Sequence, residues 1–260
     1  MTWLERLAPF VLVITIWQMA AAFRADPGVL PSPLHVLLHS FPELALFGGA
    51  SDPNPAGAFA VLGLNLTITI IRVVISLGVG SVAGFLLGLS LHCFSAAASG
   101  NAFVLTLLRS VPLFALIPLF VFWFPNREVG IFIYITLAVL LVVATNCYEA
   151  VNNIPPSFRE SATLLGAGRL TILRKVHAPA VLPELRGSMR AVSGLVWAFA
   201  LGAEYLSSQS GIGFLVYQSY LYSDMGKLVL FGMVYGIMGL LSIKAVDTTI
   251  RRVTRWQPTY

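Results

Sequence analysis

Residues 160–179 read ESATLLGAGRLTILRKVHAP, an amphipathic, basic and glycine-bearing segment between hydrophobic runs that are too long for ordinary core helices. Residues 155–157, Pro-Pro-Ser, stand just before it and are a typical start signal for a helix. We therefore predict a short helix over residues 157–165. Glu160 is expected in its first turn, where a carboxylate complements the positive end of the helix dipole.

The second half of this stretch predicts a turn followed by another helix. Gly166 and Gly168 allow the positive φ, or the close approach of backbone, that a sharp turn requires. A second helix is expected from about Leu170, carrying Arg174 and Lys175, and Pro179 is expected to end it. The result is a compact helix, turn, helix unit on a loop that we place at residues 149–188.

The rest of the chain is strongly apolar, because 57% of its 260 residues are hydrophobic and only 10% are charged. Crossing the roughly 30 Å hydrocarbon core of a bilayer takes about 20 apolar residues in a helix. This composition predicts an all-α, polytopic membrane protein in one domain, residues 1–260. Six candidate spans are visible at about 7–23, 67–91, 103–124, 129–148, 190–206 and 228–246.

The distribution of basic residues predicts the orientation, because Lys and Arg in short loops are retained in the cytoplasm. With the N-terminus inside, twelve of the sixteen Lys and Arg residues lie at the inner side, and an even number of spans places the C-terminus inside as well. The net charge of +5 then needs no nucleic acid to explain it. Cys93 and Cys147 fall near inner helix ends, in a reducing compartment, so we expect lipid-buried or packed thiols and not a disulfide.

An extracytoplasmic loop is expected over residues 26–66. Its first part, from Asp26 to Gly57, contains six prolines that interrupt any long helix. Residues 35–47 mix apolar side chains with His and Glu, which favours a short interfacial helix over a membrane-crossing one.

The spacing of the first motif resembles the EAA loop of binding-protein-dependent ABC importer permeases, where the membrane subunit grips its ATPase. The matching residues are Glu160, Ser161, Ala162, Gly166, Gly168, Val176 and Pro179. Ser161 stands for the first alanine, Val176 for isoleucine and Ala178 for leucine, all exchanges that keep the shape. The resemblance implies a coupling role; the alternative is a basic amphipathic loop that lies on lipid.

Two further stretches resemble the permeases for taurine, aliphatic sulfonates and nitrate: LRSVPLFALIPLFVFWF from Leu108, and a glutamate followed by a Gly-Ile-Gly in WAFALGAEYLSSQSGIGFLV from Trp197. The resemblance extends to the first span and to VLPSPLHV at 29–36, so we take the first span as a mature helix and not as a signal peptide. Residues expected to line the translocation path or its gate are Arg72, Pro112, Pro118, Trp197, Glu204, Gly211 and Gly213.

Alternatives stay open for several of these positions. Glu204 can line the gate or pair with Arg72 across helices, since ionisable groups in a membrane are costly when unpaired. The prolines can be packing kinks, and Trp197 can simply pack. Glu149 is interpreted as structural. Gly80, Gly84 and Gly88 stand at four-residue spacing on the second span, and Gly232, Gly236 and Gly239 form a similar stripe on the sixth. Both stripes favour static helix packing over a sliding or pore-facing surface.

As a whole, the resemblance implies a permease with the type I importer fold. It would work as a homodimer with two copies of an ATPase and an extracytoplasmic substrate-binding protein, in the lipid of a bacterial inner membrane. The resemblance implies a small anion such as a sulfonate, taurine or nitrate as the substrate, and the positive charge of Arg72 agrees with an anion.

The chain contains no GxxxxGK[ST] motif, so ATP and Mg²⁺ are expected on the partner ATPase and no enzyme activity on this chain. We expect no cofactor and no metal, because the four histidines are scattered and His35 and His39, one helical turn apart, are too few ligands. The competing functional hypothesis is an ATP-independent secondary transporter or a channel.

Overall fold

The computed structural model describes residues 3–24, 26–94 and 98–255, and all regular structure in these residues is helical. The chain divides into two compact units, which are described one at a time. The first comprises residues 1–70 and 208–236, and the second comprises residues 71–207 and 237–260. The boundaries at residues 70/71 and 236/237 fall inside the long helices α3 and α12, so each of these helices contributes one segment to each unit.

In the first unit, short helical turns follow the first helix where the Pro-rich loop was expected. Its elements are α1 (Trp3–Arg24), α2 (Pro33–His35), η1 (Val36–Ser40), η2 (Pro42–Gly48), the start of α3 (Pro55–Phe94), α11 (Ile212–Leu221) and the start of α12 (Met225–Val253). The Ser32 side chain accepts a hydrogen bond from the His35 N–H at 3.2 Å, and Pro33 follows it in the first turn. The expected helical segment within residues 35–47 is therefore present.

The helix α3 begins twelve residues before the expected span, so residues 55–66 are not loop. The cause is local, because Asn54 accepts a hydrogen bond from the Gly57 N–H at 2.6 Å and Pro55 opens the helix. Pro55 was one of the six prolines expected to interrupt a helix, whereas here it lies in the first turn of one.

The core of this first unit joins the loop turns to α11 and α12. Val36 and Leu44 from the turns pack with Ile212 and Phe231, all at most 1% exposed. Lys227 is also buried, and its ammonium contacts Asp224 at 2.6 Å and Glu43 at 3.2 Å. These carboxylates compensate the burial of the charge.

The second unit contains the remaining helices. They are the rest of α3, α4 (Ala98–Ser110), η3 (Leu113–Leu116), α5 (Ile117–Trp123), α6 (Arg127–Asn152), α7 (Pro156–Leu164), α8 (Arg169–Ile172), η4 (Leu173–His177), α9 (Ala178–Glu184), α10 (Arg186–Ser207) and the end of α12. Of the described helices, α3, α6 and α12 are long and apolar enough to cross a membrane. Residues 8–24 and 113–123 form shorter apolar helices.

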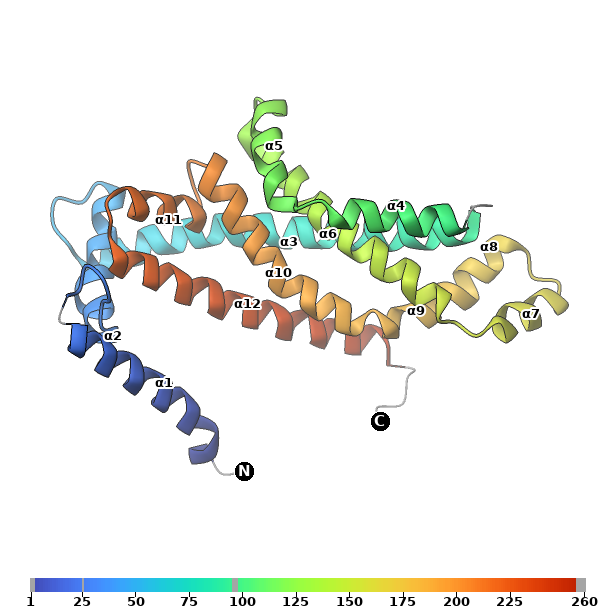
Figure 1. The fold of residues 1–260 in the computed structure, drawn as a ribbon, viewed down its shortest axis with the longest axis horizontal. Coiled ribbons are helices and arrows are strands. Elements are labelled where there is room, and N and C mark those ends of the chain that lie inside the picture. The colour runs from blue at the N-terminus through green and yellow to red at the C-terminus, as the bar shows by residue number, and fades with distance from the viewer. Residues whose placement is uncertain (1–2, 25, 95–97, 256–260) are drawn as a thin grey trace. The chain divides into compact units, whose positions relative to one another are not determined.

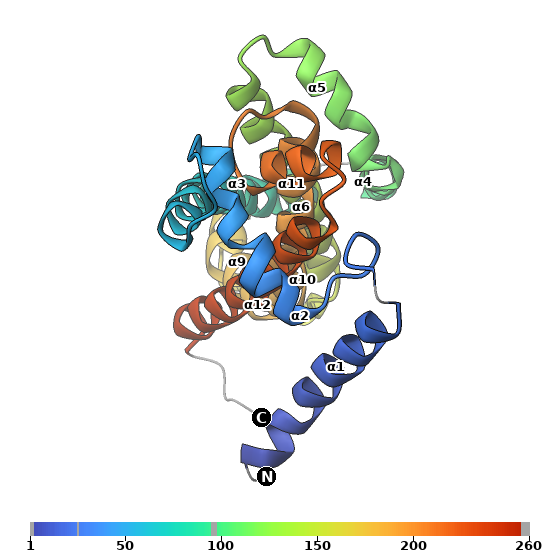
Figure 2. The ribbon, with the colours of Figure 1, turned by 90° about the vertical axis from the view of Figure 1, so that its left-hand side faces the viewer.

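The expected third span, residues 103–124, is not one bent helix. It breaks after Ser110, continues as the 3-10 turn η3 and resumes as α5, and Figures 1 and 2 show that α5 leaves the direction of α4. Pro112 has an extended backbone (φ −63°, ψ 105°) and pushes the preceding residue away from the α-helical region. Pro118 lies in the first turn of α5, where a missing N–H costs nothing.

The α3 glycines pack directly against α6. A Cβ atom placed on Gly80, Gly84 or Gly88 would lie 2.6–2.8 Å from backbone carbonyl oxygens of α6. Two helices approach this closely only when one of them lacks side chains at the contact. The packing interpretation of this first glycine stripe is therefore confirmed.

The start of α10 is joined to the end of α12 by charge. Asp247 accepts hydrogen bonds from Arg186 Nε at 2.8 Å and from Arg251 Nε at 2.9 Å. Farther along α10, Gly202 leaves room for the Phe114 ring, which would lie 2.9 Å from a Cβ at that position. The broken α4–α5 segment is thus packed against α10 at a position without a side chain.

Candidate functional site

The expected helix, turn, helix unit is present as α7, a turn at residues 165–168 and α8, which together we call the knob, residues 156–172 (Figure 1). Gly166 has a φ of 80°, in the left-handed region. The Gly166 N–H donates to the Thr163 carbonyl at 2.9 Å and the Ala167 N–H to the Ala162 carbonyl at 3.0 Å. These two bonds form a Schellman motif, which ends a helix with a glycine in the left-handed conformation.

Gly168 has a different part in the turn. Its φ of −72° and ψ of 165° are open to any residue, and it is the N-cap of α8. The expectation of a sharp glycine turn is therefore confirmed at Gly166, while Gly168 needs no special conformation.

The outer face of the knob is apolar at its tip. Leu164 is 89% exposed and Leu165 is 87% exposed, whereas Ala162 is half-buried and Glu160 and Ser161 are exposed. Sequence reasoning missed the two leucines, although they directly precede the helix-ending glycine. The two neighbouring leucines form an apolar tip on this turn.

Glu160 does not lie in the first turn. The helix α7 begins at Pro156, so Glu160 is its fifth residue, and the interaction with the helix dipole falls off within the first turn.

Pro179 does not end a helix either. Residues 173–177 widen into the π-helical segment η4, in which the Ala178 N–H donates to the Leu173 carbonyl. Pro179 follows in the first turn of α9, where it does not interrupt the hydrogen-bonding pattern. The chain therefore continues in helical form from the knob to Glu184, and Val176 is half-buried within it.

The segment that returns from the knob is anchored to two long helices. Val181 and Leu185 are buried against Leu89 of α3 and against Cys147 and Val151 of α6. Since a buried leucine or valine is worth about 1.5–3 kcal/mol relative to an exposed one, this cluster attaches the base of the knob firmly. A displacement of the knob would therefore act on α3 and α6.

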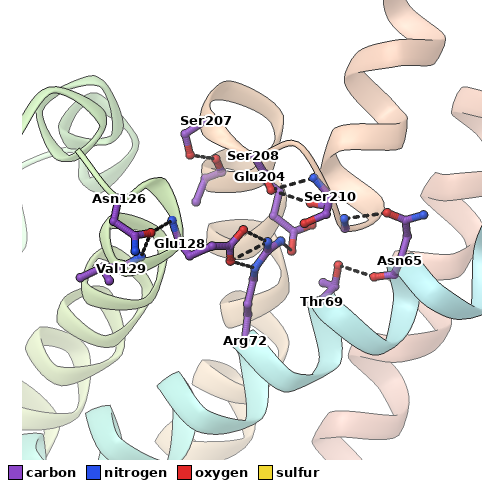
Figure 3. A network of polar contacts seen from close by, with 12 residues as sticks. Asn65, Thr69, Arg72, Asn126, Glu128, Val129, Glu204, Ser207, Ser208 and Ser210 are labelled. Atoms are coloured by element: carbon purple, nitrogen blue, oxygen red, sulfur yellow. Dashed lines mark hydrogen bonds and ion pairs between the residues drawn. The ribbon is translucent and has the colours of Figure 1, made fainter. Parts of the chain in front are cut away.

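A second notable group is a buried cluster of charges on α3, α6 and α10 (Figure 3). Arg72 is 1% exposed. It donates from Nη1 to Glu204 at 2.7 Å and from Nη2 to both oxygens of Glu128, at 2.6 and 2.8 Å. Asn126 caps α6 by accepting the Glu128 N–H at 3.1 Å, which positions Glu128 beside Arg72.

Glu204 was expected either to line the gate or to pair with Arg72, and the structure shows that the two side chains pair. Glu204 is fully buried, and half of the Glu128 side chain is exposed. Glu128 was not among the expected site residues. The available signal was its position two residues after the cap residue Asn126, in the first turn of α6.

Gly211 and Gly213 belong to the first unit, where α3 caps the start of α11. The Gly211 N–H donates to Asn65 at 2.8 Å and the Ile212 N–H donates to Thr69 at 2.9 Å. Gly211 has a φ of 96°, so the glycine is required by the backbone, while Gly213 is buried. The remaining expected path residue, Trp197, is 6% exposed on α10.

The comparisons with known proteins agree with this architecture. Residues 80–256 match the family described as "Binding-protein-dependent transport system inner membrane component". A chain of the MetNI methionine ABC transporter, solved in inward-facing conformations, has the same fold with a TM-score of 0.65 at 20% identity, over 75% of this chain and 97% of that one.

Several relatives in sequence have names that specify a substrate. The taurine transport system permease protein of Escherichia coli is 27% identical, over 96% of this chain and 88% of the relative. The nitrate import permease protein of Synechococcus elongatus is 24% identical over 91% and 86%. A Bacillus subtilis protein, named as an aliphatic sulfonates transport permease, is 26% identical over 99% and 89%.

This helical architecture defines the chain as an all-α, membrane-embedded permease with the type I importer fold. The chain belongs to the family of binding-protein-dependent transport system inner membrane components, the membrane subunits of ABC importers, in which a separate subunit hydrolyses ATP.

Proposed function

We propose that the knob of this permease docks on a separate ATPase and transmits its movement to the membrane helices. The observation that carries this proposal is the exposed pair Leu164 and Leu165 on a basic loop outside the three long apolar helices. Two leucines that are 89% and 87% exposed gain free energy when a partner covers them. Glu160, Ser161 and Gly166 flank or shape this tip.

The complete transporter that we propose contains two copies of this permease, two ATPase subunits and an extracytoplasmic binding protein. It lies in the bacterial inner membrane with both termini in the cytoplasm, as the distribution of Lys and Arg indicates. ATP and Mg²⁺ bind to the ATPase. When the ATPase subunits close, the knobs move together, and the anchored helices α3 and α6 tilt so that the central path opens to the other side.

The proposed substrate is a small anion such as a sulfonate, taurine or nitrate, and the names of the relatives support this class. Arg72 does not support it, because its guanidinium is fully engaged by two carboxylates. We propose that Arg72 and Glu204 hold the path wall together, and that Pro112, Pro118 and Trp197, with Gly211 and Gly213, border the path.

The test is co-expression with the ATPase encoded beside this chain, followed by purification through a tag on the permease. We expect stable co-purification that is lost when Leu164 and Leu165 are both changed to serine. Thr163→Ala is the matched control, because it alters the neighbouring residue of the same helix without touching the apolar tip. Equal ATPase recovery from the double variant and the control would overturn the docking role of the leucines.

If no ATPase co-purifies at all, the alternative of an ATP-independent secondary transporter or a channel becomes the better hypothesis. Substrate uptake into vesicles driven by an ion gradient alone would then support it. The buried charges of Arg72 and Glu204 would be the first residues to change in that case, since ionisable groups within a membrane commonly serve transport.

A further inference from the structure

Two histidines that were interpreted as scattered lie together at the base of the knob. His92 is near the end of α3, and His177 ends the π-helical segment η4, with their ring centroids 5.5 Å apart. The Tyr148 ring of α6 stands edge-on to His92 at 6.1 Å. This group joins the three segments that any movement of the knob must displace.

The surroundings of this histidine pair disfavour a positive charge. His177 is 5% exposed, and its Nδ1 has no hydrogen-bond partner among the described residues. A proton on that nitrogen would create a buried N–H donor without an acceptor, which is costly. His92 differs in this respect, because the side chain of Asn152 hydrogen-bonds it.

The nearby charges oppose protonation of His177 as well. Burial is the first cause that lowers the pKa of His177, followed by His92 and by the positive charge of Arg159 on α7. Glu149 on α6 is exposed, and Glu184 on α9 accepts a hydrogen bond from Asn153 at 2.6 Å. The other charged side chains on the same segment as His177 are the exposed Arg174 and Lys175.

Arg159 connects the charge state of His177 to the knob, because Arg159 itself lies on α7 of the knob. A charge on His177 repels Arg159 and thereby the helix that carries the docking surface. By linkage, displacement of α7 must in turn make protonation of His177 easier.

We propose that His92 and His177 form a protonation-sensitive joint that reduces coupling when the cytoplasm becomes acidic. A proton from cytoplasmic water adds to the free electron pair of His177 Nδ1, and no other bond is made or broken. The neutral pair keeps the base of the knob attached to α3 and α6, and the charged pair pushes α7 away. This inference rests on the proposed docking of the knob.

The direction of the pH effect follows from the lowered pKa of His177. A histidine ordinarily titrates near pH 6.5, and the environment of His177 disfavours its charged form. Coupling is therefore complete near neutral pH and is lost as the pH falls below about 6.5.

The test uses the complex of permease and ATPase in lipid nanodiscs, with ATP hydrolysis compared with that of the ATPase subunit alone between pH 5.5 and 8. We expect the ratio of the two rates to fall by about twofold or more on acidification. His177→Gln should remove this fall, and His39→Gln, in the loop of the first unit, should keep it. An identical pH profile for His177→Gln and the unaltered complex would overturn the proposal.

A second variant keeps the test decisive if His177→Gln fails to fold. Arg159 is exposed, and Arg159→Gln removes one positive charge near His177. We expect the midpoint of the pH profile to move upward by roughly half a pH unit or less. The same upward shift should be visible in the titration of His177 by NMR of ¹³C-labelled histidine in the permease alone.

ATPase recovery tests the proposed docking of the knob, and the pH dependence tests the histidine joint, so failure of one can be told from failure of the other. Absence of ATPase from the complex at every pH would refute the docking of the knob. A complex that forms normally, but in which Arg159→Gln leaves both the midpoint and the His177 titration unchanged, would refute the joint alone.

Discussion

At the scale of single residues, a buried arginine links three helices of the second unit. Arg72 uses Nε, Nη1 and Nη2 to bind carboxylates from α6 and α10. One positive charge with two carboxylates gives a formal charge of −1 for the cluster. Only Glu204 is fully buried, whereas half of the Glu128 side chain is exposed, so the uncompensated charge is not enclosed on all sides.

Replacing Arg72 by leucine should destabilise the protein strongly. The change leaves the fully buried Glu204 without its cationic partner, and breaking a buried ion pair in this way costs about 3–5 kcal/mol. Thermal unfolding in detergent measures the effect. Adding Glu204→Gln to Arg72→Leu should recover part of the loss, since the uncompensated charge is then removed. No recovery in the double variant would contradict the pairing.

Gly166 provides a second test at this scale. Gly166→Ala places a side chain at φ 80°, which costs about 1–2 kcal/mol for an L-residue. We expect a looser Schellman turn and less co-purified ATPase. Gly168→Ala is the matched change, because that residue has an ordinary φ of −72° and open space around it. A loss as large for Gly168→Ala would argue that the left-handed turn is not what matters.

At the scale of helices, close contact of α3 with α6 sets the structure of the second unit. Gly80, Gly84 and Gly88 of α3 lie against the α6 backbone, so the contact leaves no room for a methyl group. A helix contact of this kind gains stability from dispersion and from Cα–H···O contacts, because lipid offers no hydrophobic driving force.

Gly84→Ala should therefore destabilise the pair of helices. The new methyl would stand 2.7 Å from the Leu140 carbonyl oxygen, which cannot move away cheaply, and overpacking costs about 1–3 kcal/mol. Gly78→Ala on the same helix meets no described atom within 4 Å and should stabilise slightly through helix propensity. The difference between the two unfolding temperatures is the measurement, and an equal effect would contradict the packing.

At the scale of the whole molecule, the proposed topology predicts which loops are reachable from each side of the membrane. In a variant with Cys93 and Cys147 changed to alanine, a cysteine at the exposed position Asp52 should react with a membrane-impermeant maleimide in intact spheroplasts. A cysteine at the exposed Ser157 should react only after permeabilisation. The reverse pattern would show that the knob is extracytoplasmic, and would exclude ATPase docking.

Much of the architecture was predictable because it depends on local chemistry. The apolar segments, the glycine stripe of α3 and the knob with its turn at Gly166 all follow from periodicity and backbone preference. The errors were also local in origin. Asn54-Pro55 and Pro179 were interpreted as breaks, because a proline signals a boundary without telling whether a helix ends or begins there.

The sequence by itself determined the membrane class of this protein and the existence of the knob, since composition and glycine position act without distant partners. The sequence left the pairing of Glu204 with Arg72 as one of two alternatives, and the tertiary structure decided that Arg72 binds both Glu204 and Glu128 and that His92 meets His177. Those contacts join residues 56, 132 and 85 positions apart. Packing of whole helices creates such pairs, so no local pattern in the chain could select them.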